Sequence, residues 1–346
     1  MNTRAISRFR RKLAKGESVH GLWVTLESAT ITEIGVALGL DWIVIDAEHG
    51  HLDWKEINDH IRAALRSDTV VLVRLAERST SLTKRALDIG ADGVVIPWIE
   101  TVEQLEQAVR DCRYPPEGRR GIGGERATAW GQCFAEHAAE ANEHVLVVPL
   151  IESAAAVPHV PGMCEVDGIE VFFFGPADFS STLGFRGQWE GPGVAEQILQ
   201  LKETIREAGK ACGVMTTSLE NLISRRDQGF QMLGLGSDTG LLLRSLHQAL
   251  QAVDCDRMPT TSFSNPHGDI IDGETFMTSA FRLAQTADFF DEAGNAKFAD
   301  LGTSLLEEHP HIRLSKLPEF YPTISADQLA DSHGVIVLTP KSRLSR

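Results

Sequence analysis

Acidic and basic side chains follow a mainly apolar run near the start of the chain. Residues 41–45 lead into Asp46, Ala47, Glu48 and His49. A histidine beside carboxylates can act as a general base at neutral pH, because its ordinary pKa is about 6.5. We therefore predict that His49 is a catalytic base and that Asp46 lies beside it in the substrate site.

Arg74 ends a second apolar run, residues 70–73. Its planar guanidinium can hold a carboxylate or an oxyanion through paired hydrogen bonds. It can also form an ion pair with Asp46 or Glu48, and one arginine can serve both purposes. We predict that Arg74 is a catalytic residue that stabilises negative charge.

Two carboxylates follow apolar runs farther along the chain. Glu152 follows residues 145–151, and Asp178 follows residues 171–174 after a short Gly-Pro-Ala segment. In neighbouring strands these side chains would converge, and oxygen ligands of this kind suit Mg²⁺ or Mn²⁺. Acidic residues also end strands without binding a metal, so the pair alone leaves the metal open.

The elements that must position these residues are eight short apolar runs. They lie at residues 21–26, 41–45, 70–73, 93–97, 145–151, 171–174, 211–215 and 231–236. Stretches with helical spacing separate most of them, as at residues 53–66, 81–90, 101–113 and 194–209. This alternation predicts an α/β fold, a (β/α)8 TIM barrel with its site at the carboxyl ends of the strands; a doubly wound sheet is the alternative.

Length and composition indicate a barrel with a short appendage. The 346 residues exceed one typical barrel, and a turn-rich stretch follows residue 258. We predict a barrel over residues 1–258, a linker over 259–280 and a C-terminal extension over 281–346. The five cysteines form no C-x-x-C pair, so we expect free thiols.

The net charge of −15 argues against nucleic acid or an anionic membrane as a partner. No apolar stretch reaches the roughly 20 residues needed to cross a bilayer, so we expect a cytoplasmic protein. The basic segment at residues 4–15 is the local exception. We expect it to form a first helix under the barrel, with a targeting or membrane-surface helix as the alternative.

Seven motifs in order resemble those of the HpcH/HpaI aldolase family. They are Gly-Leu-Trp at 21–23, Asp-x-Glu-His at 46–49, Val-Arg at 73–74, Leu-Asp-Ile-Gly-Ala at 87–91, Tyr-Pro-Pro-x-Gly-x-Arg-Gly at 114–121, Ile-Glu at 151–152 and Phe-Gly-Pro-Ala-Asp at 174–178. The resemblance covers roughly residues 5–255. It implies a class II aldolase that uses Mg²⁺, Mn²⁺ or Co²⁺ to split a 4-hydroxy-2-oxo acid into pyruvate and an aldehyde.

The resemblance also implies roles for individual residues. Glu152 and Asp178 match the metal ligands, His49 the catalytic base, and Arg74 the residue that stabilises the pyruvate enolate. Asp88 matches an acid that raises the basicity of this histidine, and the resemblance is the only reason to select it.

Substrate contacts are implied in the same way. The first motif contributes Trp23 to the substrate pocket, and residues Gly175, Pro176 and Ala177 would hold the pyruvate carboxylate. In the long segment 114–144, which borders the aldehyde site in the family, we select Arg126 and Trp130 as residues that choose the aldehyde.

Two departures from the family pattern affect the pocket. Leu150 stands where the family often has glutamine, and Gly50, His51 and Leu52 follow the histidine in place of Ala-Pro-Asn. They leave the aldehyde open, as well as a related enolate reaction such as oxaloacetate decarboxylation. A CoA-ester lyase of the same superfamily and a non-enzymatic binding protein are the alternative functions.

The family resemblance further implies a homo-oligomer, commonly a hexamer in which the last barrel helix is exchanged between subunits. A second resemblance lies in the extension. Residues 287–294, 305–310 and 333–340 look like the opening of a D-isomer-specific 2-hydroxyacid dehydrogenase, but no G-x-G-x-x-G fingerprint follows. We expect a partial α/β unit without a nucleotide-binding domain.

Overall fold

A computed structural model describes residues 1–189 and 191–255 of the chain, together with residue 332 and the short segments 281–286, 312–317, 323–324, 334–336 and 343–344. The chain divides into two units, Met1–Asp256 and Arg257–Arg346. The predicted linker, residues 259–280, lies outside the described residues.

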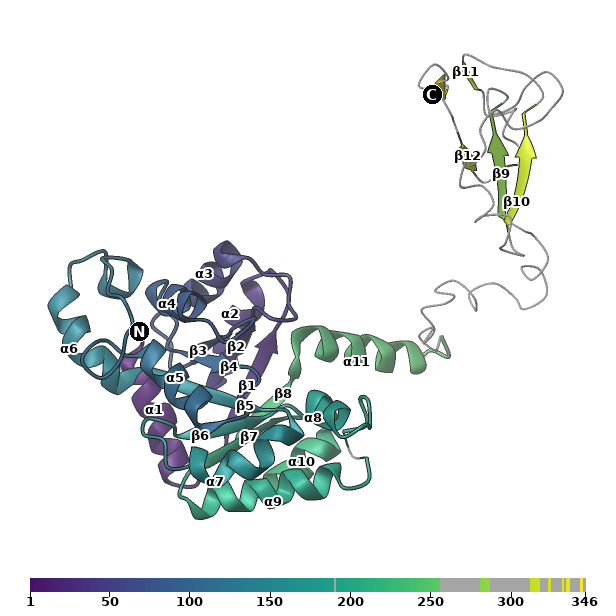
Figure 1. Ribbon diagram of the computed structural model, residues 1–346. Coiled ribbons are helices and arrows are strands. Elements are labelled where there is room, and N and C mark those ends of the chain that lie inside the picture. The colour runs from purple at the N-terminus through teal and green to yellow at the C-terminus, as the bar shows by residue number, and fades with distance from the viewer. Residues whose placement is uncertain are drawn as a thin grey trace. The chain divides into compact units, whose positions relative to one another are not determined.

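Eight parallel strands form a closed barrel in which each strand pairs with the next and β8 pairs with β1 (Figure 1). The strands are β1 (Val19–Val24), β2 (Trp42–Asp46), β3 (Val70–Arg74), β4 (Gly93–Ile96), β5 (Leu146–Ile151), β6 (Val171–Phe174), β7 (Ala211–Met215) and β8 (Met232–Ser237). The closed sheet confirms the predicted (β/α)8 barrel and excludes the doubly wound alternative.

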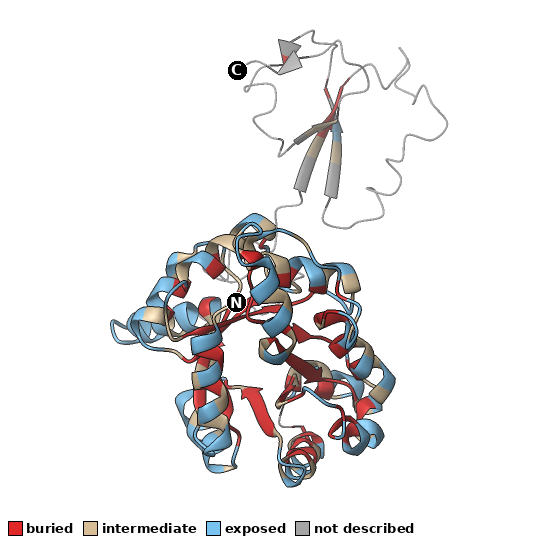
Figure 2. Cartoon of the chain, turned by 90° about the vertical axis from the view of Figure 1, so that its left-hand side faces the viewer, coloured by how far each residue is buried: buried red, intermediate tan, exposed pale blue. Residues whose placement is uncertain are grey.

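Helices surround the barrel, and most of their exposed residues lie on the outer side (Figure 2). The longer ones are α1 (Thr3–Ala14), α2 (Thr30–Ala37), α3 (Trp54–Ala63), α4 (Thr80–Asp88), α5 (Val102–Cys112), α6 (Phe134–His144), α9 (Val194–Glu207), α10 (Leu219–Asp227) and α11 (Asp238–Gln251). Shorter turns of helix are η1 (Arg126–Thr128), η2 (Ala154–His159), α7 (Val160–Met163) and α8 (Pro176–Thr182). No described helix is long and apolar enough to span a bilayer.

Side-chain caps fix where the helices on the β2-to-β5 side begin. Asp53 and Glu56 form a capping box at α3, and Thr101 and Gln104 form another at α5. The hydroxyl of Ser79 accepts from the backbone of the first turn of α4. Such caps satisfy amide groups that the helix leaves unpaired, so they set the length of each loop that follows a strand.

Every second strand residue points into the barrel. On β2, Trp42 and Val44 belong to the interior cluster, whereas Ile43 and Ile45 belong to the layer between strands and helices. Alternation of this kind follows from the two-residue period of a strand. The next inward position on β2 is Asp46, at the carboxyl end of the strand.

Helix α1 covers the opposite, amino end of the barrel. Ala5, Ile6 and Phe9 are buried in the same interior cluster as the inward strand residues. The predicted first helix under the barrel is therefore present.

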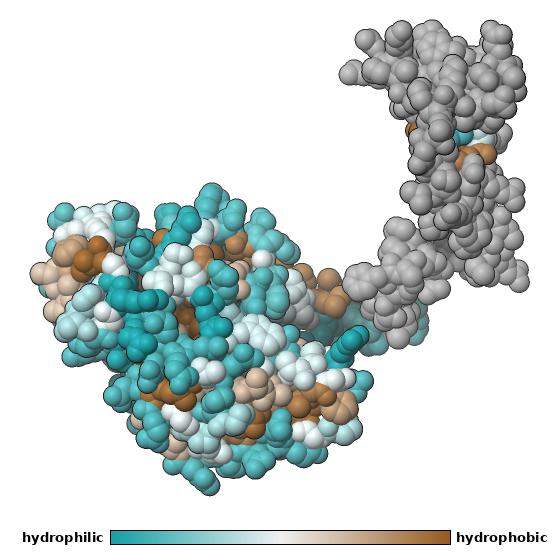
Figure 3. All heavy atoms as spheres, viewed as in Figure 1, coloured by the Kyte–Doolittle hydropathy of each residue, from teal (hydrophilic) through white to brown (hydrophobic). Residues whose placement is uncertain are grey.

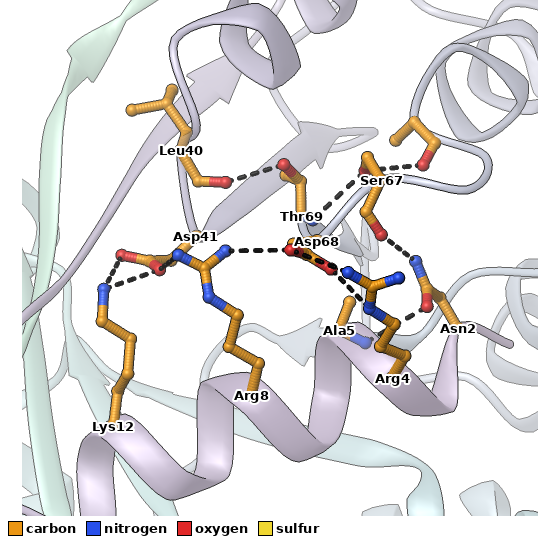
Figure 4. A network of polar contacts seen from close by, with 11 residues as sticks. Asn2, Arg4, Ala5, Arg8, Lys12, Leu40, Asp41, Ser67, Asp68 and Thr69 are labelled. Carbon is orange, nitrogen blue, oxygen red and sulfur yellow. Dashed lines mark hydrogen bonds and ion pairs between the residues drawn. The ribbon is translucent and has the colours of Figure 1, made fainter.

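Its basic side chains bind acidic residues that precede β2 and β3 (Figure 4). Lys12 Nζ lies 2.7 Å from Asp41 Oδ1, and Arg4 Nε lies 2.9 Å from Asp68 Oδ1. The basic segment thus serves contacts within the barrel.

Helix α11 leaves the barrel after β8 with little cover. Among its described residues only Asp238 is buried. Large apolar side chains on and just after it are exposed by 38–64%: Leu241, Leu242, Leu243, Leu246, Leu250 and Val253. Figure 1 shows α11 as a separate arm of the first unit, and hydrophobic residues lie on the surface where it leaves the barrel (Figure 3).

The described part of the second unit consists of short parallel strands. Strands β9 (Phe281–Gln285), β10 (Ile312–Lys316) and β12 (Gly334–Ile336) form a sheet in the order β10-β9-β12. Strand β11 (Thr323–Ile324) pairs with β13 (Arg343–Leu344). The three segments on which the dehydrogenase resemblance rests lie mostly outside the described residues.

Candidate active site

A pocket of about 210 Å³ lies at the carboxyl ends of the barrel strands. We call it the reaction pocket. It brings together nine of the residues selected from the sequence: Trp23, Asp46, His49, Arg74, Glu152, Gly175, Pro176, Ala177 and Asp178.

Strand geometry explains why these residues meet. Trp23, Asp46 and Arg74 occupy the last inward positions of β1, β2 and β3. Glu152 lies two residues after the inward Leu150 of β5, and Gly175 lies two residues after Phe173 of β6. The pocket is therefore the uppermost layer of the barrel interior, in which polar groups replace apolar ones.

Asp46 holds Arg74 and the loop that carries His49. Its Oδ1 accepts from Arg74 Nε at 2.9 Å and from the backbone N–H groups of Glu48 and His49 at 3.0 and 3.1 Å. Its Oδ2 accepts from Arg74 Nη2. The Asp46 carboxylate therefore holds the Arg74 guanidinium and the backbone of His49 in fixed positions relative to each other.

Two further groups fix the plane of the Arg74 guanidinium. Glu48 Oε2 lies 2.9 Å from Arg74 Nη1, and the Trp23 ring lies 4.6 Å from the guanidinium carbon. Burial raises the pKa of Glu48, and the positive charge of Arg74 opposes this rise. The ion pair considered from the sequence therefore exists with both Asp46 and Glu48, and it orients Arg74 toward the pocket.

Trp23 lines the pocket and carries a buried hydrogen-bond donor. Its side chain is 6% exposed, and its indole Nε1 is buried without a partner among the described residues. Buried donors are nearly always paired, so this one is an exception among the residues that line the pocket.

Glu152 is a buried carboxylate held by the backbone. It is 2% exposed, and its Oε1 accepts from the N–H of Trp98 at 2.7 Å. Trp98 has a φ of +53°, so a left-handed backbone directs this N–H. Burial raises the pKa of Glu152 to about 7; the Trp98 N–H lowers it, and negative Glu48 raises it further.

The carboxylate oxygens around Glu152 suit a hard divalent cation. Asp178 and Glu48 are close enough for their negative charges to raise the pKa of Glu152, so a cation here would relieve repulsion among carboxylates. A Cβ at Gly175 would lie 2.8 Å from Glu152 Oε2, so the absence of a side chain keeps that oxygen accessible.

The part of the chain that the structure describes holds no group of three or more His, Cys, Asp or Glu side chains arranged around a metal. A pair of carboxylates with the remaining positions filled by water or substrate oxygens is typical of Mg²⁺.

Three predicted residues lie elsewhere. Asp88, Arg126 and Trp130 together line a different pocket of about 630 Å³ beside α3 and α4. Asp88 Oδ1 accepts from Arg120 Nη2 at 2.7 Å, and Arg126 Nη1 donates to the Ile89 carbonyl at 2.7 Å.

The direction of α4 accounts for this separation. The helix begins after the carboxyl end of β3 and runs back toward the amino end of β4. Asp88 ends it, so it lies far along the barrel from His49, which follows the carboxyl end of β2. Within one chain, Asp88 and His49 therefore do not meet.

Leu150, noted in the sequence as a departure that affects the pocket, does line it. The structure adds pocket residues that were not singled out in the sequence: Thr25, Phe173, Phe174, Trp189, Met215 and Ser237. The strand period would have indicated Thr25 and Phe173, because both continue inward-facing positions of β1 and β6. Ser237 also caps α11 by accepting from the Gly240 N–H at 3.0 Å. Trp189 follows α8 in a loop, where no strand pattern points to it.

Comparisons with known proteins identify the family of this chain. The sequence profile of the family described as HpcH/HpaI aldolase/citrate lyase matches residues 20–245. The chain belongs to this family. Its assignment as a carbon–carbon lyase is thereby supported, because the relatives found are named aldolases.

Two similar proteins are named after different aldolase activities. A 4-hydroxy-2-oxovalerate aldolase of Rhodococcus jostii is 36% identical over 241 residues, which cover 69% of this chain and 93% of the relative. A 2-keto-3-deoxy-L-rhamnonate aldolase of Klebsiella pneumoniae is 34% identical over 258 residues, covering 74% and 96%. A crystal structure of a family member from Burkholderia cenocepacia is 32% identical, covers 71% of this chain and 99% of its own, and has a TM-score of 0.68.

Proposed function

We propose that this protein is a divalent-metal-dependent aldolase that cleaves or forms a 4-hydroxy-2-oxo acid from pyruvate and an aldehyde. The observation that carries the proposal is the meeting of His49, Arg74, Glu152 and Asp178 in one reaction pocket. The named activities of the relatives support a 2-oxo acid as the substrate class.

Glu152 and Asp178 would hold the cation, which when bound would supply Lewis-acid polarisation of the 2-oxo group. The carboxylates would have to be ionised to do so. The choice among Mg²⁺, Mn²⁺ and Co²⁺ is part of the proposal, and oxygen-only ligation favours the first two.

The side chains of the pocket would then perform the proton and charge steps. Arg74 would donate hydrogen bonds to the oxygen on which enolate charge develops, from an orientation already set by Asp46 and Glu48. His49 would take the proton of the 4-hydroxyl as the C3–C4 bond breaks and the aldehyde forms. The electron pair of that bond would pass to the enolate, which takes up a proton at C3 to give pyruvate.

The remaining pocket groups would bind the acid. The backbone at Gly175–Ala177 borders the pocket and would hold the pyruvate carboxylate. No lysine is among the described residues that line the pocket. A lysine-dependent aldolase reaction is therefore not favoured at this site.

The CoA-ester alternative has one supporting observation. Basic side chains and the aromatic rings of Trp54 and Trp130 line the pocket beside α4. That pocket shares no residue with the reaction pocket, so a thioester bound there would not reach His49 in the same chain. Aldolase chemistry is the better-supported function.

We further propose that the protein is a homo-oligomer, with a hexamer as the expected form, in which α11 covers a neighbouring subunit. The support is the row of exposed leucines on α11, because a soluble protein rarely leaves such a face uncovered. An oligomer would also give Asp88 a route to His49, since only a second copy could bring the two together. The native mass should be that of a monomer for the double variant Leu243→Glu/Leu246→Glu and a multiple of it for the unmodified chain.

Asp88 can be tested by mixing subunits. Coexpressed His49→Ala and Asp88→Ala chains should regain part of the activity that each variant lacks alone, because some sites would combine intact residues from two copies. No recovery in a mixed oligomer would overturn the role of Asp88.

The main test measures pyruvate release from several 4-hydroxy-2-oxo acids. Protein stripped with a chelator should be inactive and should recover with Mg²⁺, Mn²⁺ or Co²⁺. Glu152→Ala should stay inactive, whereas Glu143→Ala on the exposed face of α6 should behave like the unmodified protein. Folded protein that releases no pyruvate with any of these metals would refute the proposal.

A further inference from the structure

The carboxylate of Asp238 joins the first and last strands of the barrel at the seam where the barrel closes. Asp238 is the first residue of α11, directly after β8, and it is 5% exposed. Its Oδ1 accepts from the Thr25 hydroxyl at 2.8 Å, and its Oδ2 accepts from the Leu26 N–H at 2.9 Å. The Thr25 backbone nitrogen lies 3.1 Å from both oxygens. A buried carboxylate is costly without such donors, so these contacts hold it and its partners together.

The hydrogen bonds of Asp238 replace strand pairing where that pairing ends. The last residues that pair across the seam are Trp23 of β1 and Ser237 of β8, and the register shifts just before them. The N–H groups of Thr25 and Leu26 lie beyond this last pair and bond to the Asp238 side chain in place of a strand carbonyl. The carboxylate therefore fixes the backbone of Thr25 relative to β8.

Thr25 in turn packs against the loop that carries His49. A Cβ at Gly50 would lie 3.3 Å from the Thr25 Cα and 2.3 Å from the Asp46 carbonyl oxygen. The Gly50 backbone therefore lies between the ends of β1 and β2 with no room for a side chain. Gly50 is also one of the residues at which the chain departs from the family pattern. The glycine allows a close approach of the His49 loop to β1 that a larger residue would prevent.

The position of His49 depends on this loop because its side chain has no support of its own. The side chain is exposed, and it makes no hydrogen bond or ion pair with another described residue. The backbone therefore sets where the imidazole lies in the reaction pocket. Asp46 holds the loop up to His49 through two backbone N–H groups. Thr25 contacts the loop just after His49, at Gly50.

We propose that Asp238 is a positioning residue for the catalytic base: it holds Thr25 against Gly50 and thereby fixes His49 in the reaction pocket. Asp238 is not among the described residues that line that pocket, so it acts through Thr25, which is. The inference rests on the proposed aldolase function and adds a residue of α11 to the groups that this function needs. A carboxylate that only stabilised the barrel would affect unfolding and leave the turnover of folded protein unchanged.

The test measures kcat and KM of the full-length protein, loaded with Mn²⁺, for the 4-hydroxy-2-oxo acid that the unmodified protein cleaves fastest. Asp238→Asn keeps the size of the side chain but replaces one acceptor oxygen with an amide donor, so Thr25 and Leu26 compete for one oxygen. Its kcat should fall by about 10- to 100-fold, because a displacement of about 1 Å at a catalytic group has effects of this size. KM should stay within about twofold, since the groups proposed to bind the 2-oxo acid are unchanged.

Gly50→Ala tests the same contact from the other side. Its methyl group would collide with the Asp46 carbonyl and move the loop away from Thr25, so kcat should fall and KM should again be nearly unchanged. If both changes act through one contact, kcat of the double variant Asp238→Asn/Gly50→Ala should lie within about twofold of the lower single variant. Losses that multiply in full would mean that the two residues act independently, and would overturn the proposal.

A matched control is Asp92→Asn at the amino end of the barrel. Asp92 is 3% exposed and likewise accepts from backbone N–H groups, those of Asn2 and Val71. The change should lower the free energy of unfolding but leave kcat of folded protein within about twofold.

Circular dichroism establishes that each variant folds before kcat is compared. Thr25→Val, which removes only the hydroxyl contact to Asp238, should lower kcat by a smaller factor and replaces Asp238→Asn if that variant does not fold. Unchanged kcat in these folded variants, or an equal fall in Asp92→Asn, would overturn the positioning role while the aldolase function stands. Absence of pyruvate release from the unmodified protein would overturn both.

Discussion

The two ends of the barrel carry similar ion pairs that have different roles. At the amino end, Asp41 binds Lys12 at 2.7 Å and accepts from the His20 N–H at 3.0 Å, which ties α1 to the strands. At the carboxyl end, Asp46 binds Arg74 in the wall of an open pocket. Asp41 joins helix α1 to the strands, whereas Asp46 orients the guanidinium of Arg74 toward the reaction pocket.

The groups near the Asp46–Arg74 pair also bear on its role. Near Asp46 and Arg74 lie a buried donor without a partner, Trp23 Nε1, and a buried carboxylate without an ion pair among the described residues, Glu152. A buried carboxylate without a counter-charge costs stability, and a cation in the reaction pocket would relieve this cost for Glu152. Ion pairs alone would not have distinguished the active end from the structural end.

The largest expected effect is on Arg74. Arg74→Lys keeps the positive charge but loses the planar fork that binds Asp46 and Glu48, so kcat should fall by about 100- to 1000-fold. Steady-state pyruvate release measures it. The matched change at the other end, Arg8→Lys near Asp41, should leave kcat within about twofold, because that arginine lies 3.7 Å from Asp41 and far from the reaction. Equal losses in the two variants would contradict the division between the ends.

The next effect concerns Glu152 and pH. Its pKa is 4.5 in an unfolded chain and about 7 in the folded protein, so between these values the folded state binds more protons. The free energy of unfolding of metal-free protein should therefore fall as pH rises from about 4.5 to 7, by ~3 kcal/mol from this group.

Chemical denaturation in the presence of a chelator measures this dependence. Glu152→Gln should lack that part of the pH dependence, because glutamine does not ionise. Parallel pH profiles for the variant and the unmodified protein would show that Glu152 has an ordinary pKa. Metal should reverse the trend, since it binds the ionised carboxylate.

The smallest effect is expected at the amino end. Lys12→Ala removes the shortest ion pair of Asp41, and the free energy of unfolding should fall by about 1–2 kcal/mol with kcat unchanged. Urea denaturation and pyruvate release test both halves of this expectation. A loss of kcat in a folded Lys12→Ala protein would mean that the two ends are coupled.

Much of the site could be predicted because one physical rule governs it. Apolar runs mark buried strands, and the residues that end them share one face of the barrel. This rule places Asp46, Arg74, Glu152 and Asp178 together without any contact being known.

The residues to which this rule does not apply lie off the strands. Asp88 was selected by resemblance alone, although it lies near the end of a predicted helix, residues 81–90, that runs from the carboxyl end of one strand to the amino end of the next. Helix α6 was also missed within the segment 114–144. Its described residues bury only Ala141, so the apolar stripe that identifies a helix is lacking.

The most direct test of the account is hydrogen exchange at C3 of pyruvate, because it reports enolate formation without any choice of aldehyde. In D₂O with Mg²⁺ or Mn²⁺, the protein should replace the methyl protons of pyruvate with deuterium, followed by NMR. Exchange should stop with a chelator or in Glu152→Ala, and it should slow in Arg74→Lys. Exchange that continues in the presence of the chelator, or that is absent from folded, metal-loaded protein, would contradict the claim that the carboxyl end of this barrel makes a metal-stabilised enolate.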